Sequence, residues 1–133
     1  MIEITITLCI LGILTAIAMP EATKLLDRVR VRSAVADIES TFNGARHLAI
    51  ARSAQAEVHI DAGARRLYVI VGSDTARKRD IGTEHGVELS PSRDHMIYSA
   101  TGAGYGAANL SVVVKRNLAV DTVFVSRLGR IRH

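Results

Sequence analysis

The sequence predicts an α+β fold in which a long N-terminal helix, membrane-embedded in its first half, packs on an antiparallel β-sheet. Three observations support this prediction. Residues 4–19 are apolar and uncharged, apolar residues then recur at helical spacing to about Ser53, and beyond Ser53 their period changes to two. The 133 residues suffice for one modest domain. We divide the chain into a transmembrane half-helix (1–20), an amphipathic half-helix (21–53) and a β-rich part (54–133).

The first element is the run ITITLCILGILTAIAM at residues 4–19. As a helix it would span roughly 24 Å, slightly less than the ~30 Å hydrocarbon core of a bilayer. Three interpretations are open: a buried core helix, a secretory signal cleaved after Ala16-Ile17-Ala18, and a membrane anchor. A core helix that is apolar on every face would require a larger protein, and a signal would begin with Lys or Arg. The sequence therefore favours a membrane anchor.

The second half of the helix is predicted from a stripe of apolar side chains, with Gly44 as a possible local break. The stripe has the 4, 3, 4, 3, 4 spacing of one helix face, and its members are Val31, Val35, Ile38, Phe42, Ala45 and Ala49. Such a face normally packs on a core.

The β-rich part begins with a predicted hairpin, in which Ala56–Ile60 and Arg66–Val71 flank turn residues. Residues 73–95 are polar, so we expect a long loop there, with a short strand at Val87–Leu89. Further strands are predicted at His95–Ser99, Leu110–Val114, Thr122–Ser126 and Arg130–His133.

The N-terminus resembles that of mature type IV pilins and type II secretion pseudopilins. Glu3, then Gly12 nine residues later, then Pro20 at the end of the apolar stretch keep the spacing of that family. The resemblance implies that Glu3 pairs with the N-terminal amine of a neighbouring subunit, and that Pro20 lets the helix bend or melt in a filament. It also implies pilin or pseudopilin partners, an inner-membrane anchor and a periplasmic C-terminal part. The alternative role for Glu3 is a charge that snorkels to the membrane edge.

One departure from the family concerns the start. The leader peptide, with its basic residues, and about two residues of the mature start are missing, so we expect a truncated or mis-assigned start. Basic residues follow the apolar run and none precedes it, which by the positive-inside rule would leave the C-terminal part in the cytoplasm. A basic leader would remove that conflict.

The net charge of +4 lies entirely in residues 115–133, through Lys115, Arg116, Arg127, Arg130 and Arg132 against Asp121. On a strand, Arg130 and Arg132 would share one face, Ile131 would face the core, and Gly129 would permit a preceding turn. The ending resembles the GspH/FimT group. In FimT-type minor pilins of DNA-uptake systems, a Gly-Arg-x-Arg string such as Gly129–Arg132 binds DNA. The tail could therefore contact the phosphates of double-stranded DNA, contact a partner subunit, or protect an edge strand by its charge.

No catalytic or metal-binding pattern stands out. The five histidines lack metal-ligand spacing, and the lone cysteine, Cys9, can form neither an internal disulfide nor a cysteine-based zinc site. Residues 102–107 match G-x-G-x-x-A, but a strand rather than a helix is predicted to follow. We therefore expect no enzyme activity, cofactor, metal or small-molecule substrate. Two hypotheses remain: a GspH-like structural subunit of a type II secretion pseudopilus, and a FimT-like minor pilin that binds DNA for natural transformation.

Overall fold

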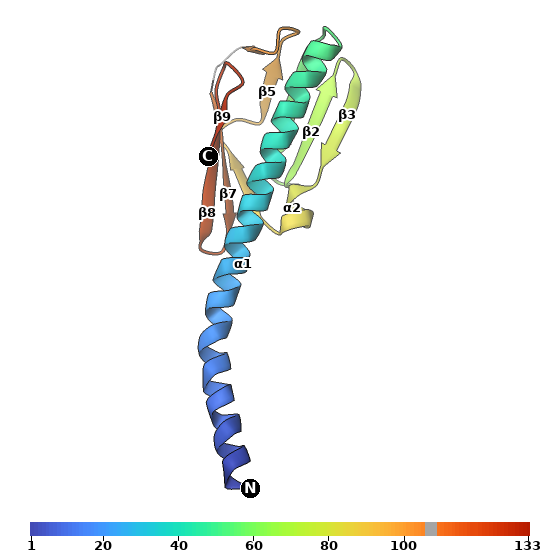
Figure 1. The fold of residues 1–133 in the computed structure, drawn as a ribbon. Coiled ribbons are helices and arrows are strands. Elements are labelled where there is room, and N and C mark those ends of the chain that lie inside the picture. Colours follow the sequence, from blue (N-terminus) through green and yellow to red (C-terminus); the bar gives the residue numbers. More distant parts are fainter. Residues whose placement is uncertain (106–108) are drawn as a thin grey trace.

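The structure is a computed structural model that describes residues 1–105 and 109–133. Its main element is α1, a helix of 50 residues at Ile2–Ala51. Figure 1 shows the N-terminal half of α1 projecting alone, while its C-terminal half lies against the sheets. All six residues of the predicted apolar stripe are buried, which confirms it as a core face. The fold class is confirmed: a long N-terminal helix packs on antiparallel β-sheet.

The helix is continuous through Gly44, so the expected break there was wrong. A side chain from another element fills the space beside this glycine: a Cβ atom at Gly44 would lie 3.0 Å from the Nη1 atom of Arg77. The absence of a side chain therefore serves packing at this position, because tertiary contacts outweigh the weak helix propensity of glycine.

The described strands form two sheets rather than one, and every pairing is antiparallel. The first sheet has the order β3-β2-β1-β5-β6 and comprises β1 (Ala56–Asp61), β2 (Arg66–Val71), β3 (Asp74–Arg79), β5 (His95–Tyr98) and β6 (Gly104–Tyr105). The second has the order β4-β7-β8-β9 and comprises β4 (Glu88–Pro91), β7 (Leu110–Arg116), β8 (Ala119–Val125) and β9 (Ile131–Arg132). The predicted hairpin and the later predicted strands are all present, with ends shifted by up to three residues.

The long loop expected at residues 73–95 was wrong. This segment contains β3 and the short helix α2 (Ile81–His85), neither of which was expected, while β4 corresponds to the short strand predicted at Val87–Leu89. β3 is an edge strand that buries no residue, so the alternation that marks a half-buried strand is absent from its sequence. Pro91 ends β4, an edge strand, where a missing N–H is tolerated.

The glycine-rich match at residues 102–107 includes β6, and its last two residues lie outside the described part of the chain. The next described element is the strand β7, as predicted, and not the helix that a phosphate-binding loop requires.

The core lies between α1 and the inner faces of both sheets. Alternate residues of β1, β2 and β7 point inward, as the period of two requires. The largest fully buried side chains are those of Tyr98 and Phe42. α1 contacts strands of both sheets, so its buried face joins them into one domain.

Candidate assembly and binding surfaces

The projecting half of α1 is the first candidate surface. Residues 1–26 are all exposed, and their large apolar side chains, from Ile2 to Leu26, cover every face of the helix. α1 contains a window near the N-terminus that is long and apolar enough to cross a membrane, and none of that window is buried. So much exposed apolar surface on a small protein requires a lipid or protein environment to cover it.

Glu3, Gly12 and Pro20 all lie on this projecting half, where each is exposed. The structure spaces them along the helix rather than bringing them together: Glu3 and Pro20 are roughly 25 Å apart at ~1.5 Å per residue. A Cβ atom at Gly12 would meet nothing within 4 Å, so no contact within this chain requires a glycine there.

Pro20 lies inside α1, and the helix continues through it. Proline has no N–H, so one i→i−4 hydrogen bond is missing from the backbone ladder at this point. The Thr23 hydroxyl donates a hydrogen bond of 2.8 Å to the Pro20 carbonyl oxygen. Pro20 is therefore a weak point within a regular helix. It lies seven positions before Asp27, the first side chain of α1 that bonds the β-rich part among the described residues.

The basic tail is the second candidate surface. Two backbone bonds close its turn: the Ser126 N–H donates to the Arg130 carbonyl at 2.9 Å, and the Gly129 N–H donates to the Ser126 carbonyl at 2.9 Å. The Arg130 N–H also donates to the Ser126 hydroxyl at 3.1 Å. Gly129 has φ +72°, a conformation that glycine adopts without steric cost. After this turn β9 pairs with β8, placing Ile131 opposite Val125 and Arg132 opposite Phe124.

Arg130 and Arg132 line the same groove, which has a volume of about 540 Å³. Ile131 packs against the core between them. The groove also contains two exposed apolar side chains, Phe124 at 56% and Leu128 at 69% exposure. The groove thus combines two guanidinium groups with apolar side chains. Arg127 is exposed but is not among the residues that line this groove. The remaining lining residues are Asn109, Leu110, Ser111, Val125 and Ser126.

Arg46 of α1 lies beneath the tail turn, and sequence analysis did not identify it. A Cβ atom added to Gly129 would lie 3.2 Å from Cδ and 3.3 Å from Nε of Arg46. The Arg46 Nε atom is buried and has no hydrogen-bond partner among the described residues. Nothing in the spacing of the sequence indicates that residues 46 and 129 meet, because their contact depends on the arrangement of the sheets.

Lys115 and Arg116 lie at the other end of the β7–β8 hairpin. They pair with Val120 and Ala119, whereas the tail pairs with residues 124 and 125. At ~3.3 Å per residue this separation is roughly 15 Å. These two cations do not extend the groove at Arg130 and Arg132.

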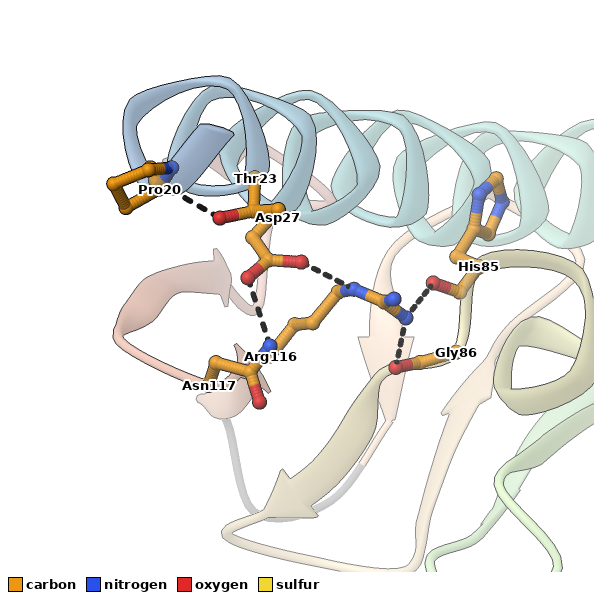
Figure 2. Close-up of polar contacts among 7 residues, drawn as sticks. All are labelled: Pro20, Thr23, Asp27, His85, Gly86, Arg116 and Asn117. Atoms are coloured by element: carbon orange, nitrogen blue, oxygen red, sulfur yellow. Dashed lines mark hydrogen bonds and ion pairs between the residues drawn. The ribbon is translucent and has the colours of Figure 1, made fainter. Parts of the chain in front are cut away.

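Arg116 instead joins three elements (Figure 2). Its Nε atom donates to Asp27 Oδ1 at 2.6 Å, and its Nη1 atom donates to the carbonyl oxygens of His85 at 3.0 Å and Gly86 at 2.7 Å. Asn117 donates to the other Asp27 oxygen at 2.8 Å. The bonds from Asn117 and Arg116 lower the pKa of Asp27 from its usual value. We call Asp27, Arg116 and Asn117 the α1 clamp.

Comparison with solved structures gives the fold a name. The type IV minor pilin FimU of Pseudomonas aeruginosa superimposes with a TM-score of 0.68 over 81% of this chain and 90% of FimU, at 16% identity. A second crystal form of FimU gives a TM-score of 0.62 at 17% identity, over 76% and 90% of the two chains. The fold is that of the minor pilins.

The minor pseudopilin EpsH from the type 2 secretion system of Vibrio cholerae is also similar. Its TM-score is 0.59 at 11% identity, over 77% of this chain and 94% of EpsH. No protein-family model matches the chain, and no curated protein matches it significantly. Both kinds of neighbour, pilin and pseudopilin, thus share this pilin-like fold.

Proposed function

We propose that this chain is a GspH-like minor pseudopilin, a structural subunit of the pseudopilus of a type II secretion system. The observation that supports this function best is the form of α1: a bare apolar half, with a carboxylate at Glu3, continues without interruption into a half that packs on a minor-pilin domain. Before assembly, residues 1–20 would anchor the chain in the bacterial inner membrane, with residues 54–133 in the periplasm. In the filament, the same apolar surface would pack against neighbouring subunits.

Glu3 is the residue proposed to set the position of the subunit. A carboxylate within an apolar helix is costly in a membrane or a filament core unless it has a partner. The N-terminal amine of a neighbouring subunit would satisfy it there, while Gly12 and Pro20 would allow close packing and bending of the helix.

Replacing Glu3 tests this assembly role. Glu3→Ala should abolish incorporation into filaments in cells, measured by the recovery of the subunit in sheared filament fractions, while its level in the membrane stays normal. Glu21→Ala is the matched control, since Glu21 is also exposed on α1 but lies beyond Pro20. Normal incorporation of the Glu3 variant would refute the role assigned to Glu3.

The second candidate function is that of a FimT-like minor pilin, which binds double-stranded DNA during natural transformation. The groove that contains both Arg130 and Arg132 favours it, because two guanidinium groups on one exposed edge suit phosphate contacts. The same groove also suits a partner subunit, since Phe124 and Leu128 add an apolar surface that phosphates do not need.

A gel-shift assay with the full chain in detergent separates these candidates. Under DNA binding, Arg130→Ala/Arg132→Ala should remove a salt-sensitive shift of duplex DNA. Lys78→Ala/Lys115→Ala should retain it, although it removes the same charge from other surfaces. If the unmodified protein gives no shift even at low salt, the DNA-binding candidate is excluded and the pseudopilin proposal is untouched.

A further inference from the structure

Two carboxylates and one imidazole meet where α2 packs on α1. The oxygen ligands of Asp37 and Glu84 and a ring nitrogen of His85 all lie within 4.8 Å of one another. Asp37 belongs to α1, whereas Glu84 and His85 are consecutive residues of α2. Helix periodicity and motif spacing could not predict this cluster, because Asp37 lies 47 positions before Glu84 in the sequence.

The three side chains differ in their existing partners. The His85 Nε2 atom is 2.7 Å from Asp37 Oδ2, and the side chains of His85 and Asp37 are 17% and 29% exposed. The Glu84 side chain is 44% exposed, and the Nη1 atom of Arg79 lies 3.9 Å from Glu84 Oε2. At that distance Arg79 makes an ion pair rather than a close hydrogen bond, so the Glu84 carboxylate retains acceptor capacity.

Contacts outside the cluster hold α2 in place. Asp80 caps its start by accepting from the Thr83 N–H at 3.0 Å, and it also binds Arg66 at 2.8 Å. Gly86 ends it with φ +62°, and Arg116 donates to the backbone carbonyls of His85 and Gly86. Figure 2 shows the His85 imidazole directed toward α1 from this anchored turn. The backbone of α2 that carries Glu84 and His85 is thus anchored by bonds that involve none of the three side chains.

We propose that Asp37, Glu84 and His85 bind a divalent transition-metal ion, with Zn²⁺ as the best match. Zn²⁺ accepts imidazole nitrogen and carboxylate oxygen at ~2.0–2.2 Å, so its ligand atoms lie roughly 3.4 Å apart in a tetrahedron, with water as the fourth ligand. Asp37 Oδ2 and His85 Nε2 are now 2.7 Å apart, so this hydrogen bond would open by side-chain rotation as the ion binds. Ca²⁺ and Mg²⁺ fit less well, because they require six or more mostly oxygen ligands.

The bound ion would connect residue 37 of α1 to residues 84 and 85 of α2. It would fasten the segment between the two sheets to the helix and stabilise the folded state by mass action. This inference goes beyond the proposed function, since it holds for a pseudopilin and for a DNA-binding pilin alike.

The test uses the full chain in detergent, stripped of metal and titrated with ZnCl₂ against a colorimetric chelator. We expect saturable 1:1 binding, and an increase in the midpoint of thermal unfolding with Zn²⁺ that exceeds any increase with Ca²⁺. Glu84→Gln and Asp37→Asn, which preserve side-chain size, should each weaken Zn²⁺ binding by at least about 10-fold. Because Glu84 is partly exposed, its variant should fold normally.

His95→Ala is the matched control, since His95 is an exposed histidine on the first sheet that also pairs with an aspartate. It should leave the affinity for Zn²⁺ unchanged. Absence of saturable binding would overturn the proposal, and so would equal affinities of the unmodified protein, Glu84→Gln and Asp37→Asn.

Discussion

The Nε atom of Arg116 lies 2.6 Å from Oδ1 of Asp27, although the two residues are 89 positions apart in the sequence. The side chains are 22% and 14% exposed. This ion pair belongs to the α1 clamp, and Asp27 is the first partly buried residue of α1 counted from the N-terminus, since residues 1–26 are all exposed. The pair therefore marks the point at which the projecting helix joins the folded domain.

Removing the Arg116 side chain should destabilise this junction. Arg116→Ala removes one of the two donors to the Asp27 carboxylate and the guanidinium donor to two backbone carbonyls. Partly buried groups that lose a partner keep their desolvation cost. We expect the midpoint of thermal unfolding, followed by circular dichroism in detergent, to fall by several degrees. Lys115→Ala, at the exposed neighbouring position, should change it little. Equal midpoints for the two variants would show that the α1 clamp contributes nothing to stability.

Acid should weaken the anchor of α2. The hydrogen bond from Arg66, together with that from the Thr83 N–H, lowers the pKa of Asp80 to about 2, from 3.8 in the absence of these contacts. A carboxyl group with a lower pKa in the folded state stabilises that state above about pH 4, and the contribution is lost as the pH falls toward 2. Asp80→Asn retains the helix cap but loses the charge. Urea unfolding should show this variant to be less stable at pH 7 and its stability to fall less between pH 4 and 2.

Alkali should act through Tyr98. Burial raises the pKa of its hydroxyl to about 12, from an ordinary 10. The unfolded chain would lose this proton first, so the free energy of unfolding should decrease as the pH rises from about 10 to 12. Tyr98→Phe should reduce that decrease. Tyr105→Phe is the control, since Tyr105 is 67% exposed, and it should leave the decrease unchanged.

A side chain at Gly129 should strain the tail. Gly129→Ala forces a non-glycine residue to φ +72° and places its Cβ atom 3.2 Å from Arg46 Cδ. The backbone conformation alone costs roughly 1–2 kcal/mol. Gly72→Ala is the control, because it has a similar conformational cost at φ +66° but its Cβ atom would lie more than 4 Å from other groups. In urea unfolding, the Gly129 variant should therefore be the less stable of the two, and the reverse order would contradict the contact with Arg46.

Prediction from the sequence succeeded for the long helix and for the strands that bury one face, whereas the five-residue helix α2 is too short to show a period. The apolar residues from Val31 to Ala49 and the alternating apolar residues of Arg66–Val71 are the ones that the structure buries. Their period therefore predicted correctly that the first segment is a helix and the second a strand. β3 escaped prediction because its residues are polar on both faces, as an edge strand permits.

Fewer of the contacts at the candidate sites could be predicted from the sequence. That Arg130 and Arg132 would share a face follows from the period of a strand, and they do line one groove. The positions of Arg46 beneath Gly129, and of Asp37 beside His85, depend on the packing of α1 across both sheets. The charge of Lys115 and Arg116 could be counted from the sequence, but their distance from the tail could not, because it depends on the direction of the β7–β8 hairpin.

The placement of the α1 clamp has a mechanical consequence. Residues 1–26 are all exposed, so a tension applied along the bare half of α1 first reaches a partly buried residue at Asp27, and Pro20 lies upstream of that point. The helix would therefore extend at Pro20, where its hydrogen-bond ladder is already incomplete, while Asp27 and Arg116 transmit the remaining load to the β7–β8 hairpin. The molecule would thus have a flexible helical extension and a rigid domain, with the boundary between them in the eight residues from Pro20 to Asp27.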